Sequence, residues 1–271
     1  MRMREVEQGR LWVSERHVEA LERAGLLSFE SLYEAKGTLA TRERPGKRRE
    51  VVRIELDVEE EKRGFYLKRH DKETLGERIA GWMEGDGCKT PARREWENIE
   101  LLTGMGIPTM TGVAWGEDAG TGRSLSLTEE LKDYEPLDEH IAKVDYRERR
   151  RLATELGELV RRLHSAGLTH KDLYLCHVFA TRGGGDETDL RLIDVQRVGR
   201  RGLRLRRWRV KDVAQLEYSR PTSVTRTDCV RFLRAYFGVG KLGSAQKDFV
   251  RSVMAKAESI RVHDMKKRGG I

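Results

Sequence analysis

One short stretch of this 271-residue chain constrains its fold more than any other. It reads Thr169-His170-Lys171-Asp172-Leu173-Tyr174-Leu175-Cys176-His177 and is followed, after a hairpin-like segment, by Leu192-Ile193-Asp194. In kinase-type sites one Asp orients the acceptor hydroxyl, a residue five positions later holds a metal, and a second Asp beyond the hairpin holds the metal that bridges the phosphates. We therefore predict a phosphoryl-transfer site, with Asp172 as the base and with His177 and Asp194 as metal ligands.

Simpler explanations exist for each of these residues alone. Asp172 could cap a turn and Asp194 could end a strand, but the two together with their apolar flanks favour the catalytic interpretation. His177 stands where protein kinases carry Asn, and imidazole suits softer ions than Mg²⁺. Three alternatives follow for this position. The enzyme could be active with Mn²⁺, it could hold a single metal tightly, or His177 could only form a hydrogen bond within its loop.

The pattern before this stretch is that of a small, strand-rich lobe. A short helix is expected at 18–27, followed by an antiparallel meander. Five strand-like segments and one longer helix follow one another in the order 37–41, 51–57, 64–69, helix 91–105, 111–115 and 124–131.

After Pro136 the pattern becomes helical. The longest helix is expected from Tyr146 to Ala166, and Gly167 stands at its C-terminal cap, directly before the catalytic-loop candidate. We expect an α+β, two-lobed, protein-kinase-like fold, in which an antiparallel five-stranded N-lobe with one main helix spans 1–131 and a mostly helical C-lobe spans 132–271. The tail at 266–270 is expected to be disordered.

The first lobe offers candidate nucleotide-binding residues. Lys68 lies on the third strand, just before the main helix, where a kinase needs a lysine for the α and β phosphates, and Glu95 is its expected partner. Glu97 and Glu100 are the alternatives, and both point away from the apolar face of the helix. Glu129 and Leu131 lie in the segment that corresponds to a hinge for adenine. No GxGxxG motif joins the first two strands, so phosphate contacts there would come from the amides and basic side chains of 41–48.

Composition limits the possible partners and compartment. The 53 Lys and Arg against 45 Asp and Glu give a net charge of +8, which predicts anionic partners. No apolar run reaches the roughly 18 to 20 residues that span a bilayer, and the first residues lack a signal-peptide core, so a cytoplasmic protein is expected. The three cysteines are too scattered for a disulfide framework and lack the paired spacing of a zinc site.

An arginine-rich run follows Asp194. Arg197, Arg200 and Arg201 lead this run, which continues to Arg209, and it lies where kinases place the activation segment and acceptor groove. So many guanidinium groups suit an anionic glycolipid better than a peptide, although a charge run can also be a solvated face. Only Trp208 interleaves with the arginines, so we expect no nucleic-acid partner.

With these pieces in order, the chain resembles the lipopolysaccharide core kinases of the Kdo/WaaP family, a branch of the protein-kinase-like fold. The segments that carry the resemblance lie between about residues 65 and 220, and they are Phe65-Tyr66-Leu67-Lys68-Arg69-His70, Arg94-Glu95-Trp96 with Gly106-Ile107-Pro108-Thr109, the loop from His170 to His177, Ile193-Asp194-Val195-Gln196-Arg197 and Arg207-Trp208-Arg209-Val210-Lys211-Asp212.

The resemblance implies transfer of the ATP γ-phosphate to a sugar hydroxyl, of heptose or Kdo, in the lipopolysaccharide inner core. It implies Mg²⁺ or Mn²⁺, an anionic glycolipid acceptor (lipid A-core oligosaccharide) and peripheral contact with the inner face of the cytoplasmic membrane. Two other functions stay open: a small-molecule phosphotransferase of the aminoglycoside or choline kind, and a non-catalytic pseudokinase that binds anionic glycan. The intact Asp172 and Asp194 argue against the second, and the oligomeric state is not predicted.

Overall fold

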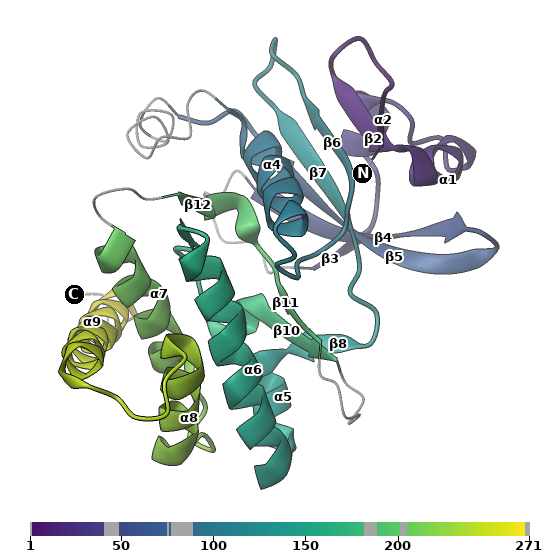
Figure 1. Cartoon of the computed structure of the whole chain (residues 1–271). Coiled ribbons are helices and arrows are strands. Elements are labelled where there is room, and N and C mark those ends of the chain that lie inside the picture. Colours follow the sequence, from purple (N-terminus) through teal and green to yellow (C-terminus); the bar gives the residue numbers. More distant parts are fainter. Residues whose placement is uncertain are drawn as a thin grey trace. The chain divides into compact units, whose positions relative to one another are not determined.

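A computed structural model describes residues 2–40, 49–74, 76, 89–181, 189–200 and 205–268 (Figure 1). Contacts divide the chain into two compact units. Unit 1 comprises Met1–Leu102 and Met110–Lys132, and unit 2 comprises Thr103–Thr109 and Asp133–Ile271. The division after Lys132 lies one residue from the expected lobe boundary, whereas the short segment before Met110 groups with unit 2.

Unit 1 is built on an antiparallel sheet with the strand order β1-β2-β6-β7-β5-β4-β3, seven strands within the described residues. The strands are β1 (Met3–Glu5), β2 (Leu11–Ser14), β3 (Thr38–Leu39), β4 (Arg49–Val58), β5 (Glu61–His70), β6 (Gly112–Glu117) and β7 (Ser124–Glu129). The expected count of five was therefore wrong. The five expected strands are β3 to β7, and the short β1 and β2 extend the sheet beyond β6.

One face of this sheet carries the hydrophobic core of unit 1. Alternate residues of β4, from Val52 to Val58, are buried on that face because side chains of a strand alternate between the two faces. Helices α1 (Val18–Arg23) and α2 (Phe29–Tyr33) add Leu21 and Phe29 to the same cluster. The longer helix α4 (Pro91–Gly104) contacts the opposite face, which carries Lys68.

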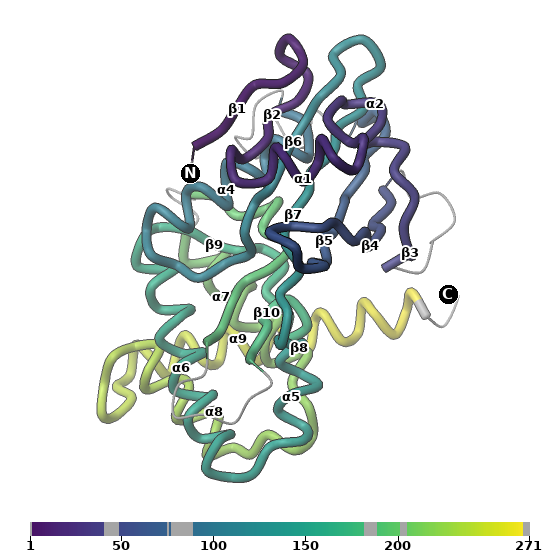
Figure 2. The backbone as a smooth tube through the Cα atoms, turned by 90° about the vertical axis from the view of Figure 1, so that its right-hand side faces the viewer, coloured from purple at the N-terminus to yellow at the C-terminus, as the bar shows by residue number. Residues whose placement is uncertain are grey.

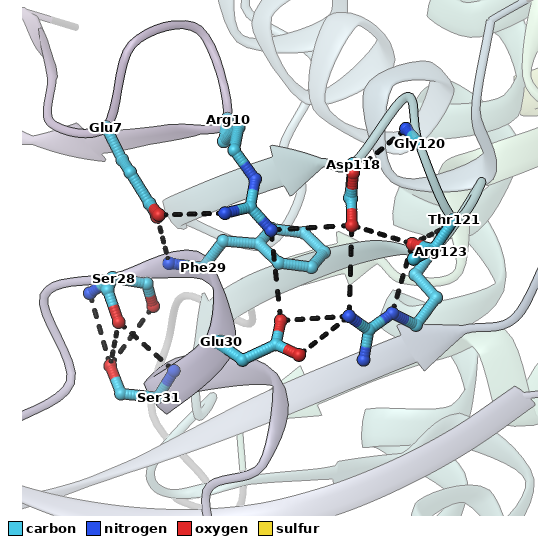
Figure 3. Close-up of polar contacts among 10 residues, drawn as sticks. All are labelled: Glu7, Arg10, Ser28, Phe29, Glu30, Ser31, Asp118, Gly120, Thr121 and Arg123. Atoms are coloured by element: carbon cyan, nitrogen blue, oxygen red, sulfur yellow. Dashed lines mark hydrogen bonds and ion pairs between the residues drawn. The ribbon is translucent and has the colours of Figure 1, made fainter.

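Figure 3 shows how the N-terminal segment is fastened to the turn between β6 and β7. Arg10 and Arg123 each lie within ion-pair distance of both Glu30 and Asp118. Both guanidinium groups also lie over the Phe29 ring, at 5.1 and 5.8 Å from its centroid. The residues before β3 are thus an integral part of unit 1.

Unit 2 is mostly helical, with two small sheets of order β11-β10-β8 and β12-β9. Its elements are β8 (Tyr134–Pro136), α5 (Leu137–Lys143), α6 (Tyr146–Ser165), β9 (Leu168–Thr169), β10 (Val178–Thr181), β11 (Leu190–Leu192), β12 (Gly199–Arg200), α7 (Leu205–Ser219), α8 (Arg226–Phe237) and α9 (Ser244–Arg268). The expected hairpin is confirmed as β10 and β11, and its turn lies outside the described residues. Single 3-10 turns cover Leu175–His177 and Val195–Arg197 in unit 2, and another covers Glu15–His17 in unit 1.

The long helix α6 leads directly to the predicted catalytic loop. The Asp145 side chain caps its first turn, and its apolar side chains, from Leu152 to Leu163, are buried. Gly167 ends it at φ +76°, a conformation that glycine adopts without strain. Helix α6 packs against α8, and α7 against α9 (Figure 2).

Helix α9 continues to Arg268, so the expectation of disorder from Lys266 to Arg268 was wrong, and the last three residues lie outside the described part. No helix in the described ranges combines the length and the apolar character needed to cross a membrane.

Candidate active site

In unit 1, Lys68 and Glu95 form the ion pair that the sequence predicted. Lys68 Nζ donates to Glu95 Oε1, and Ser126 Oγ donates to Glu95 Oε2 at 2.7 Å. The Glu95 side chain is 1% exposed and that of Lys68 is 10% exposed. A buried carboxylate is costly unless its oxygens are hydrogen-bonded, and both oxygens of Glu95 are. The pair is therefore preformed.

The choice of Glu95 over its neighbours follows from the helical period. Glu95 shares the buried side of α4 with Ala92, Ile99 and Leu102. Neighbours in this series are three or four residues apart, so they lie on one face of the helix. Glu97 instead forms ion pairs with Lys89 and Arg93 at the surface.

The predicted hinge residue Glu129 is held by a residue that the sequence did not single out. His17 Nε2 lies 3.0 Å from Glu129 Oε1, and the His17 side chain is 1% exposed. The hydrogen bond to His17 lowers the pKa of Glu129 against the opposing effect of burial. The Glu129 amide donates to the Thr111 carbonyl at 2.9 Å, so it is already used inside the sheet. Leu131, the other hinge candidate, directly follows β7.

In unit 2, a buried aspartate of α7 positions the predicted catalytic loop through its backbone. Asp212 is 0% exposed and accepts hydrogen bonds from the amides of His170 and Lys171 at 2.7 and 2.8 Å and from His164 Nε2 at 3.2 Å. Lys171 has φ +69°, a strained value for a residue with a side chain. Because Asp212 holds the backbone of Lys171, it also positions the next residue, Asp172.

Two further polar residues of α7 extend the same support. Gln215 accepts from the Leu173 amide and donates to the Lys171 carbonyl, both at 3.0 Å. Ser219 Oγ accepts from the Leu175 amide at 2.9 Å. Asp212, Gln215 and Ser219 are three and four residues apart and so occupy one side of the helix. This spacing is visible in the sequence, and it could have indicated that one face of α7 supports the loop.

His177 and Asp194 are brought together by contacts around Ile193. The Ile193 amide donates to the His177 carbonyl, and His170 Nε2 donates to the Ile193 carbonyl, both at 3.0 Å. His177 Nδ1 donates to the Asp172 carbonyl at 2.8 Å, because a carbonyl can only accept. The hydrogen bond within the loop is therefore present, and Nε2 is the atom that could bind a metal.

The pKa of His177 reports the same environment. Burial lowers it, but hydrogen bonds with Cys176 and the Asp172 carbonyl, together with the Asp194 charge, outweigh burial and raise the pKa to about 9. Asp194 itself adopts φ +53°, in the left-handed region.

The arginines of the predicted acceptor groove have different surroundings. Arg197 Nη1 lies 3.0 and 3.2 Å from the two carboxylate oxygens of Asp172. Arg200 is exposed on β12, where it pairs with Leu168, and Arg201 lies outside the described residues. Arg209 belongs to α7 and donates to the His164 carbonyl, so the end of the run supports the fold.

These residues fit ATP with a divalent metal. Asp194 offers carboxylate oxygens, the ligand type that Mg²⁺ prefers, and His177 would offer Nε2 once a bound ion has displaced the proton from that nitrogen. The two would leave room for phosphate oxygens and water around a six-coordinate ion. The Lys68 ammonium suits nucleotide phosphates, and Glu95 orients it.

The fold and these residues define a protein-kinase-like phosphotransferase. A sequence model of the "Lipopolysaccharide kinase (Kdo/WaaP) family" matches residues 40–236, and the chain belongs to this family. It is 31% identical to "Lipopolysaccharide core heptose(I) kinase WaaP" of Escherichia coli K12, over 81% of this chain and 86% of the relative. It is 34% identical to the protein of the same name from Pseudomonas aeruginosa PAO1, over 77% of this chain and 80% of the relative.

A solved structure agrees with this assignment. "WaaP in complex with acyl carrier protein" is 29% identical to the chain, covers 92% of it and 97% of the solved chain, and has a TM-score of 0.68. The expected protein-kinase-like fold and the expected family are thus confirmed.

Proposed function

We propose that this protein transfers the γ-phosphate of ATP to a sugar hydroxyl of the lipopolysaccharide inner core, with a heptose as the acceptor sugar. The observation that carries the chemistry is the loop of unit 2, in which α7 holds the backbone that presents Asp172. The choice of sugar is supported by the relatives, which are named as heptose(I) kinases.

Each residue of the site then has a chemical role. Asp172 orients the acceptor hydroxyl and accepts its proton, and Lys68, held by Glu95, binds the α and β phosphates. Asp194 and His177 Nε2 bind the metal, for which Mg²⁺ is the first choice and Mn²⁺ the alternative that the imidazole suggests. An ion held there would supply positive charge to the phosphates. The backbone around Glu129 and Leu131 binds adenine.

The acceptor is proposed to be the anionic glycolipid lipid A-core oligosaccharide. Arg197, which pairs with Asp172 in the free protein, would turn to the anionic groups of the acceptor together with Arg200 and Arg201. The net charge of +8 supports peripheral contact with the inner face of the cytoplasmic membrane, whose lipids are anionic.

We also propose that unit 2 accepts an acyl chain carried by an acyl carrier protein, the partner in the solved relative. A cavity of about 420 Å³ in unit 2 is lined mainly by apolar residues of α5 to α9, including Ile141, Leu152, Leu156, Leu216, Val253 and Met254. Its size suits one small apolar ligand. Acylated carrier protein should raise the unfolding temperature of the wild type but not of Leu156→Trp. Stabilisation by the carrier protein without its acyl chain would contradict this role of the cavity.

Lipopolysaccharide from a strain that lacks the gene tests the proposed function. Mass spectrometry should show an inner-core heptose without its phosphate, and the wild-type gene should restore the phosphate whereas Asp172→Asn should not. Western blotting of both proteins controls for expression. Core oligosaccharide that keeps all its phosphate in the deletion strain would refute the proposal.

A further inference from the structure

The catalytic loop lacks a positive charge between its two functional ends. Residues 173–176 are Leu, Tyr, Leu and Cys, so the stretch between Asp172 and His177 carries no basic side chain. Phosphoryl transfer spreads negative charge over the three equatorial oxygens of the moving group, and protein cations placed at those oxygens stabilise the transition state. Arg197 already pairs with the Asp172 carboxylate, so a cation for the oxygens of the moving group would have to be a further one.

Lys211 of α7 is placed to supply it. Its Nζ donates to the carbonyl of Lys171 at 2.6 Å, and that carbonyl belongs to the peptide bond that leads into Asp172. Gln215 donates to the same carbonyl at 3.0 Å, which fixes the acceptor that Lys211 uses. The ammonium also lies 5.3 Å from the centre of the Trp208 ring, so its position is defined from two sides.

The Lys211 ammonium has a carbonyl and an aromatic ring as partners, but it forms no ion pair with any carboxylate of the described ranges. The nearby carboxylates are otherwise engaged: Asp172 pairs with Arg197, and Asp212 accepts from two amides and a histidine. A half-buried ammonium without a carboxylate is unfavourable unless an anion arrives.

The pKa of Lys211 agrees with this geometry. Burial lowers it most and the positive charge of Arg197 lowers it further, whereas the charges of Asp172 and Asp212 raise it, with a net shift downward. A dianionic phosphoryl group beside the ammonium would favour its charged form.

We propose that Lys211 contacts the transferred phosphoryl group and is a catalytic residue of the transfer. The inference rests on the proposed function. In the step it serves, the bond between the γ-phosphorus and the bridging oxygen of ATP breaks, and a bond from that phosphorus to the acceptor oxygen forms. The hydroxyl proton passes to the Asp172 carboxylate, and ADP leaves with the bridging oxygen. Lys211 stabilises the charge on the oxygens of the moving group.

The test compares Lys211→Met, Lys211→Arg and Lys256→Met. Lys256 is an exposed lysine of α9 whose charge also acts on Lys211, so its replacement removes a nearby charge without touching the site. Two quantities are measured on the full-length protein: kcat for phosphate transfer to lipid A-core acceptor, and the affinities for Mg·ADP alone and for Mg·ADP with aluminium fluoride, which imitates the phosphoryl group in flight.

We expect Lys211→Met to lower kcat about 100-fold and to weaken binding of the aluminium fluoride complex by a similar factor. Its affinity for Mg·ADP should stay within about three-fold of the wild type, because ADP lacks the transferred group. Lys211→Arg, which keeps a cation, should retain at least about a tenth of the activity, and Lys256→Met should behave as the wild type.

Other outcomes distinguish a wrong role for Lys211 from a wrong proposed function. If Lys211→Met weakens both nucleotide complexes equally, Lys211 only anchors the loop and the inference is wrong. It is equally wrong if this variant keeps its kcat. If the wild type itself transfers no phosphate to the core acceptor, the proposed function fails and the role of Lys211 with it.

Discussion

The candidate site residues of the two units are held in different ways. In unit 1, Lys68 and Glu95 sit on a strand and a helix and restrain each other through their charged groups. In unit 2, Asp172 lies in a loop, and α7 holds the backbone of the two residues before it. A direct ion pair places a functional group through its own charge, whereas backbone anchoring places Asp172 without using its carboxylate. In unit 2, replacement of Asp212 should therefore lower the transfer rate about as much as replacement of Asp172.

Replacement of Asp212 should have the largest effect. Asp212→Ala leaves the amides of His170 and Lys171 buried without their acceptor, which at about 2 kcal/mol for each amide should destabilise the protein by about 4 kcal/mol and lower the transfer rate about 100-fold. Urea unfolding and a transfer assay measure the two effects. Ser219→Ala, which removes a partner farther along the loop, is the matched control and should cost less. An Asp212→Ala protein with wild-type activity would show that backbone anchoring does not place Asp172.

Breaking the ion pair of unit 1 should have the second-largest effect. Lys68→Met leaves the buried Glu95 carboxylate with its hydrogen bond from Ser126 but without its cation, so we expect a loss of about 3 kcal/mol in the free energy of unfolding and weaker ATP binding. The double variant Lys68→Met/Glu95→Leu removes both charges and should recover most of the stability but none of the ATP binding. Recovery of both would mean that Lys68 has no role toward phosphate.

A smaller effect is expected at Glu129, where an N-terminal residue contacts the hinge candidate. Since His17 lowers the pKa of Glu129 below its ordinary 4.5, the ionised carboxylate stabilises the fold above that pH, and this contribution is lost as the pH falls through the lower, folded-state pKa. The stability difference between wild type and Glu129→Gln should thus be present near pH 6 and shrink below about pH 4.

Urea unfolding at several pH values measures this difference, with Glu19→Gln on the exposed side of α1 as the control. A difference that stays constant from about pH 6 to about pH 3.5 would show that the bond to His17 does not depend on the charge of Glu129.

Local spacing made much of this account predictable. The helix α6, its glycine cap and the loop from His170 to His177 are contiguous, so their periodicity and order are visible in one sequence. The partner of Lys68 followed from the helical period, which separates Glu95 from Glu97.

What escaped prediction depends on long-range contacts or on short elements. His17 and Glu129 are 112 residues apart, and nothing in either local pattern couples them. Strands β1 and β2 are three and four residues long, too short for a clear alternation of polar and apolar side chains. The contact of Arg197 with Asp172 needs the actual loop geometry, because charge alone suggested an acceptor groove.

The most direct test of the account is transfer of radioactive phosphate from [γ-³²P]ATP to purified lipid A-core oligosaccharide that lacks its heptose phosphate, measured for the wild type and for Asp172→Asn. Asn keeps the size of the side chain and removes the carboxylate that accepts the proton. We predict labelled core sugar with the wild type and a loss of at least about 100-fold in rate with Asp172→Asn, while its affinity for Mg·ATP is preserved. Equal rates for the two proteins would contradict the assignment of the base, and unlabelled acceptor with the wild type would contradict the proposed function.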